Sequence, residues 1–168
     1  MHRLVFAGVM VCGTAAFATA QGASLQPFGT NCSYNGQPLA MGTVGLPQIG
    51  TTFTLAYSGP NLANTLTIQP AIALGLATTN LPIPTSFLPQ QPPGCAQLVT
   101  PDVIAIMPIT TAGAFLTQLD VAVPNTPTLA GFQFAAQWFA LAIQCGIILP
   151  CDLVALPTSD AVLATVGF

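Results

Sequence analysis

The sequence predicts an all-β protein, folded as a single disulfide-stapled β-sandwich of the jelly-roll or immunoglobulin-like kind with roughly seven to nine short strands. Two observations predict this class. Proline (16 residues) and glycine (15 residues) interrupt the chain roughly every eight to twelve residues. Between these interruptions lie short runs in which apolar and polar residues alternate, as they do in strands that bury one face.

Alternation is most regular in residues 52–57 and 115–123. In the second run one face carries Phe115, Leu119, Val121 and Val123 together with Thr117. Gln118 and Asp120 fall on the other face, and Pro124 ends the strand. Further strands are predicted at residues 96–100, 103–107 and 161–166.

Two segments allow more than one interpretation. Pro70 separates residues 65–69 from 71–76, which indicates either two short strands or one edge strand with a break. Residues 132–143 fit a strand and a helix equally well, because the glutamines in this apolar run share a face at either period. The β-rich surroundings favour a strand. A proline-rich stretch, residues 82–94, predicts one long extended loop.

The N-terminus has the pattern of a secretory signal peptide. A short basic head precedes an apolar run, which ends in the small residues Ala18 and Ala20. This pattern predicts a signal peptide at residues 1–20, cleaved between Ala20 and Gln21. The apolar run is too short for a helix that spans a bilayer. We therefore expect one domain at residues 21–168, secreted to the extracellular space or the cell surface and not held in a membrane after cleavage.

Loss of residues 1–20 would remove the only basic side chains, His2 and Arg3. The remaining charged groups are all carboxylates: Asp102, Asp120, Asp152 and Asp160. Without Lys or Arg the domain could not neutralise phosphates, so nucleic acid is not an expected partner. Hydrolysis by Ser-His-Asp or Cys-His groups needs a histidine base that the domain would lack. We therefore expect no enzyme of these mechanisms.

The four carboxylates leave one catalytic alternative, a hydrolase that uses two of them as acid and base. None of them lies in the Asp-Thr/Ser-Gly sequence of aspartic proteases. The sequence also lacks the D-x-D-x-D-G loop of a calcium site and the closely spaced cysteine pairs of a zinc site. We expect four solvated carboxylates and no metal or other cofactor.

Four cysteines would remain after cleavage, and an even number in an exported chain predicts disulfides, with three pairings open. The short spacing of Cys145 and Cys151 across a turn favours a bond between these two. Cys32 and Cys95 would then pair and tie the N-terminal region to the middle of the domain.

Several short motifs follow one another in a recognisable order. They are Phe28-Gly29-Thr30-Asn31-Cys32, Pro47-Gln48-Ile49-Gly50-Thr51-Thr52-Phe53, Pro93-Gly94-Cys95-Ala96-Gln97-Leu98, residues 129–137 and Thr158-Ser159-Asp160-Ala161-Val162. This order resembles an uncharacterised family of exported bacterial modules, found alone or at the C-terminal end of larger secreted proteins. The resemblance implies a β-sandwich-like domain with no assigned activity. It also implies pairing of Cys32 with Cys95, and it makes Cys145 and Cys151 an additional pair.

These observations predict a secreted, non-catalytic structural or adhesion module of the cell surface, envelope or extracellular matrix, whose partner is a second copy or a surface polysaccharide. An alternative is a carbohydrate- or surface-binding module with Trp138 and Tyr34 as ligand contacts. Trp138 shares a predicted strand face with Phe132 and Phe134, which favours a place in the core for its ring. The carboxylate-pair hydrolase is the second alternative.

Overall fold

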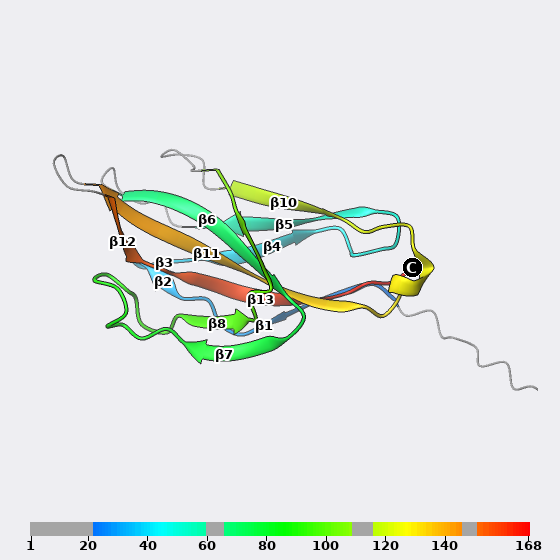
Figure 1. Ribbon diagram of the computed structural model, residues 1–168, viewed down its shortest axis with the longest axis horizontal. Coiled ribbons are helices and arrows are strands. Elements are labelled where there is room, and N and C mark those ends of the chain that lie inside the picture. Colours follow the sequence, from blue (N-terminus) through cyan, green and yellow to red (C-terminus); the bar gives the residue numbers. More distant parts are fainter. Residues whose placement is uncertain (1–21, 60–65, 109–115, 146–150) are drawn as a thin grey trace, which may run out of the picture.

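Two antiparallel β-sheets pack face to face, and the prediction of an all-β sandwich is confirmed (Figure 1). The computed structural model describes residues 22–59, 66–108, 116–145 and 151–168. The signal peptide predicted at residues 1–20 and its cleavage site lie outside these residues. The part of the chain that is described contains no helix with the length and hydropathy needed to cross a bilayer.

The larger sheet has six strands in the order β1-β13-β11-β6-β9, with β12 also paired to β11. Its strands are β1 (Ser24–Phe28), β6 (Leu66–Gly75), β9 (Val103–Ile106), β11 (Gln133–Cys145), β12 (Cys151–Ala155) and β13 (Thr158–Thr165). The long strand β11 lies at its centre, with β6 along one side and β12 and β13 along the other.

The smaller sheet has three strands in the order β10-β5-β4. They are β4 (Ala40–Val44), β5 (Thr52–Ser58) and β10 (Leu116–Ala122). A hairpin of β7 (Thr78–Pro82) and β8 (Ala96–Val99) forms a third layer on the other face of the larger sheet. Two short strands, β2 (Ser33–Tyr34) and β3 (Gln37–Pro38), and a 3-10 turn, η1 (Pro127–Leu129), complete the described elements.

Strand β11 shows why the chain forms three layers. Its even-numbered residues, Trp138 and Ala140 among them, pack into the main core between the two sheets. Its odd-numbered residues face the opposite way, and Ala135 packs with Leu98 and Val99 of β8. The strand interpretation of residues 132–143 is therefore confirmed. Both faces of β11 are covered, which explains its nearly continuous apolar sequence.

Pro70 lies inside one continuous interior strand, which corrects the expectation of two short strands or an edge strand. Strand β6 pairs with β11 on one side and with β9 on the other. The carbonyl of Pro70 accepts a hydrogen bond from the Met107 N–H (2.9 Å), so the proline nitrogen also points toward β9. The missing N–H of Pro70 therefore withholds a donor only from the Met107 carbonyl, at the end of β9, and leaves the bonds between β6 and β11 intact.

A buried glutamine joins the hairpin layer to the larger sheet. Gln137, which is fully buried, accepts a hydrogen bond from the Leu98 N–H through Oε1 (2.8 Å). Its Nε2 donates to the carbonyls of Ala96 and Ser159, at 2.9 Å each. One side chain thus satisfies a donor and two acceptors on β8 and β13, which would otherwise be buried without partners.

Both predicted disulfides are present. Cys32 and Cys95 are buried and bonded to each other, and they link the segment before β2 to the start of β8. The Thr158 N–H also donates to Cys32 Sγ (3.0 Å), which adds β13 to this junction. Cys145 and Cys151 are exposed and bonded, and they join the end of β11 to the start of β12.

We expect Gln137→Leu to lower the free energy of unfolding by about 3 kcal/mol, because the change leaves three backbone groups buried without partners. Urea denaturation followed by the fluorescence of Trp138, the only tryptophan, measures this loss. Gln118→Leu, on the exposed face of β10, is the matched control and should change stability by less than about 0.5 kcal/mol. Equal effects of the two changes would contradict the role assigned to Gln137.

The two disulfides should differ in their contribution to stability. Replacing both Cys32 and Cys95 by serine removes a closure of 63 residues and should cost about 4 kcal/mol on the chain-entropy account. The same double change at Cys145 and Cys151 removes a closure of 6 residues and should cost about 2 kcal/mol. Urea denaturation of the two variants compares these values, and a larger loss at the shorter loop would refute the assignment.

Candidate interaction surface

The aromatic residues proposed as ligand contacts lie inside the protein. Trp138 has 0% of its surface exposed and Tyr34 has 2%. The Trp138 ring packs against Tyr57, with ring centroids 5.7 Å apart, and the Tyr34 hydroxyl donates to Gln90 Oε1 (2.7 Å). This placement corrects the expectation of a sugar-stacking platform at Trp138 and Tyr34, because neither ring presents a face to solvent. The pattern of β11 already favoured the core for Trp138, whereas Tyr34 lay in no predicted strand.

The carboxylates are dispersed over the fold and bind backbone or hydroxyl groups. Asp102 Oδ2 accepts from the Leu76 N–H (2.7 Å), and Asp160 Oδ1 accepts from the Met41 N–H (2.9 Å). Asp120 Oδ1 accepts from the Thr54 hydroxyl (2.7 Å). Asp152 lies on β12 opposite Gln144.

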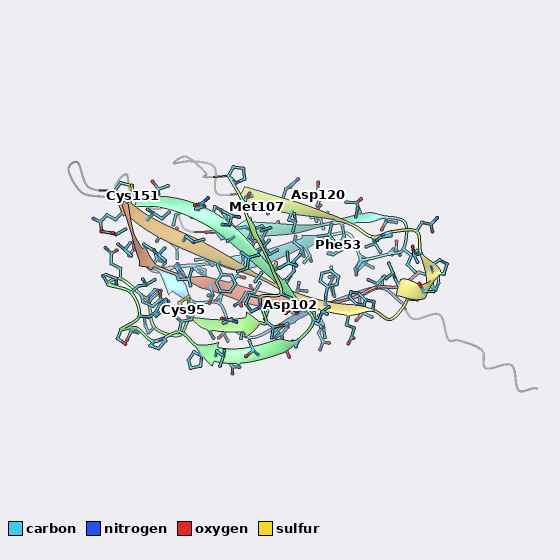
Figure 2. All side chains as sticks on the ribbon, viewed as in Figure 1. Phe53, Cys95, Asp102, Met107, Asp120 and Cys151 are labelled. Atoms are coloured by element: carbon cyan, nitrogen blue, oxygen red, sulfur yellow. A yellow bond between two sulfur atoms is a disulfide. The ribbon has the colours of Figure 1, made fainter. Side chains whose placement is uncertain are left out.

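The structure keeps Asp102, just before β9, apart from Asp120 on β10, so these two carboxylates do not form an acid–base pair for hydrolysis. Figure 2 shows Asp102 beside the start of β9 and Asp120 well away from it, on β10 of the smaller sheet. Within the described ranges, no three His, Cys, Asp or Glu side chains are grouped so that they could hold a metal ion. The arrangement observed for these carboxylates is one of local hydrogen bonds to nearby strands and turns.

A shallow apolar depression of about 210 Å³ lies between the proline-rich loop and the larger sheet. Its lining is Leu81, Pro82, Ile83, Pro84, Phe87, Gln97, Phe139 and Leu156. Gln97 supplies the one polar side chain in this lining, and no charged group takes part. Such a lining can contact an apolar side chain or a ring of a partner, but it offers little to orient a charged ligand.

Large apolar side chains are exposed along β9. Val103, Ile104 and Ile106 have 56%, 59% and 61% of their surface exposed. Ile106 is opposite Ala71 of β6, and Ala71 is opposite Phe139 of β11, so an apolar row crosses the sheet from β9 to the depression. Ala71 itself is buried (4% exposed), so the exposed apolar surface lies at the two ends of this row, on β9 and at the depression. Exposed apolar patches mark interaction sites more often than single exposed residues do.

The sequence predicted a strand at residues 103–107 but did not indicate that the strand lies at a sheet edge. That position depends on which strands pair, and the pairing involves β6 and β11, which are distant in sequence. A sequence signal was nevertheless present. The run Val103-Ile104-Ala105-Ile106 is apolar at every position, which fits either a strand covered on both faces or one with an exposed apolar face.

We expect Tyr57→Phe to stabilise the protein by up to about 1 kcal/mol, because the Tyr57 hydroxyl is buried and has no hydrogen-bond partner among the described residues. Tyr34→Phe, the matched control, removes the bond to Gln90 and should destabilise by about 1 kcal/mol. Urea denaturation at neutral pH measures both changes. A clear loss of stability in Tyr57→Phe would show that its hydroxyl is satisfied.

The same pair of variants gives a pH test. Burial raises the pKa of Tyr57, so the folded protein keeps the neutral phenol while the unfolded chain ionises above about pH 10. The stability present below pH 10 is therefore lost as the pH rises above it. Tyr57→Phe should reduce this alkaline loss, and an unchanged slope of stability against pH would contradict the assignment.

Comparison with known proteins finds no matching family model, no matching curated protein and no matching solved structure. The resemblance to exported bacterial modules therefore depends on the short sequence motifs alone, and a functional proposal for this chain starts from its own surface.

Proposed function

We propose that this chain is a secreted, non-catalytic structural or adhesion module of the cell surface, envelope or extracellular matrix. The observation that carries the proposal is the exposed apolar surface of the larger sheet, formed by β9 and the depression beside Phe87. A module of this kind acts by contact with another surface, including that of a second copy.

The small number of charged side chains supports a role in surface contact rather than in catalysis. The whole sequence contains four acidic and two basic or imidazole side chains, and the described residues include only the four carboxylates. Three of these carboxylates hold neighbouring backbone or hydroxyl groups. A surface with so few charges resists association weakly, because charged and well-mixed surfaces are what keep soluble domains apart.

The disulfides support an extracellular location. Two of them in one domain indicate folding in an oxidising compartment. The signal-peptide pattern at residues 1–20 points to the same compartment. A domain with two covalent links is suited to a matrix or surface layer outside the cell.

Light scattering coupled to size exclusion tests the proposal on the secreted, cleaved chain over a range of concentrations. We expect the average mass to rise above that of one chain as concentration increases. The association should change little between low and high salt, because apolar and backbone contacts are not screened. A mass of one chain at every concentration would contradict self-contact and would turn the search toward a polysaccharide partner.

A further inference from the structure

Four of the five edge strands of the two main sheets carry a proline, a charge or a covering group, whereas the four-residue strand β9 carries none of these three among the described residues. β1 contains Pro27, and β10 carries Asp120. β4 is held by the bond from Met41 N–H to Asp160, and β12 is covered by the loop residue Gln90, whose N–H donates to the Val154 carbonyl. Proline, charge and covering loops are the common means by which proteins protect sheet edges.

The backbone of β9 leaves a defined set of groups on its free side. The Met107 N–H bonds to Pro70, so alternate residues of β9, Ala105 and Val103, also direct their N–H and C=O groups toward β6. Ile104 and Ile106 therefore direct theirs away from β6. Among the described residues no strand pairs with this side.

These groups match a second copy of the same strand in an antiparallel arrangement. With a two-fold axis at Ala105, Ile104 lies opposite Ile106 of the second copy, and Ile106 lies opposite its Ile104. Each of these pairs exchanges two backbone hydrogen bonds, so all free N–H and C=O groups of Ile104 and Ile106 are satisfied. The register also places the isoleucines of both copies side by side on one face.

The flanking residues fit this arrangement. Asp102 lies opposite Pro108 of the second copy, and the two Asp102 carboxylates lie about 20 Å apart along the strands, so they do not repel at close range. Pro108 has no N–H, so the pairing ends there. Figure 2 shows Asp102 and Met107, which mark the two ends of β9.

From these observations we propose that two copies of this chain associate by antiparallel pairing of β9, which joins their larger sheets into one continuous sheet. The proposal rests on the proposed structural role and names the contact that serves it. The contact is closed, because each copy contributes the same edge strand to it. Larger assemblies would need a second surface, such as the apolar depression.

Cysteine cross-linking tests the register directly. Ile104→Cys and Ile106→Cys are purified separately and then mixed under mild oxidation. Opposed Cα atoms in such a pair lie about 5.5 Å apart, within reach of a disulfide, whereas equal residues of the two copies lie roughly 8 Å apart, beyond it. We expect about tenfold more cross-linked dimer in the mixture than in either variant alone. Equal amounts in all three samples, or none in the mixture, would overturn the proposal.

Light scattering on a second pair of variants distinguishes pairing at β9 from the structural or adhesion role in general. Ile104→Lys should weaken the association at least about tenfold, because two charges would enter the pairing face. Val44→Lys, an equally exposed residue on β4, should leave it unchanged. Association that is unaffected by Ile104→Lys would refute pairing at β9 while the structural role stands. Absence of association in the unchanged chain, together with absence of cross-linking, would refute both pairing at β9 and self-contact as the basis of the structural role.

Discussion

The hydrogen bonds of Gln137 hold the third layer of this protein to the sheet beneath it. The side chain lies on the central strand β11, and it reaches β8 on one side and β13 on the other. The Cys32–Cys95 bond and the Thr158 N–H fix the start of β8, next to these contacts. With the hairpin in place, Ala135 and Ala161 are covered, and the larger sheet can be apolar on both faces.

An amide suits this position because the domain has almost no charge to place there. A buried carboxylate would need a cation beside it, and the described residues contain neither lysine nor arginine. A glutamine provides donors and an acceptor without that requirement. Gln91 acts in the same way: its Oε1 accepts from the Leu156 N–H, and its Nε2 donates to the Leu156 carbonyl. Buried amides thus replace ion pairs in joining the loops to the sheets.

Much of the fold could be predicted, because the alternation of apolar and polar residues and the spacing of proline and glycine are local properties of the sequence. The strand at residues 52–57 and the one at 115–123, as far as it is described, follow from the period of apolar residues. The strand character of 132–143 was predicted from its β-rich surroundings, because its period fits a strand and a helix equally well. Both disulfide pairings were also predictable, since spacing favoured the short pair and left the long one. The place of Pro70 was not predictable, because its tolerance depends on where β9 ends. The burial of Tyr34 was not predictable either, since it depends on a contact with Gln90 across the fold.

The surface, too, has features that follow from local sequence and features that depend on how the strands pair. Sequence pattern identifies β9 as a strand, but only the pairing order shows that the strand is an edge and that its outer side is open. A domain with four carboxylates has few charged residues that could protect its sheet edges. Asp120 lies on β10, Asp160 holds β4, and Asp102 lies just before β9, where it bonds the Leu76 N–H. Among the described residues, β9 is the edge left without charge, proline or cover, and its free backbone groups are self-complementary about a two-fold axis. Pairing with a second copy would therefore protect this edge as effectively as a charge would, because a closed pair leaves no unpaired strand for further chains to extend.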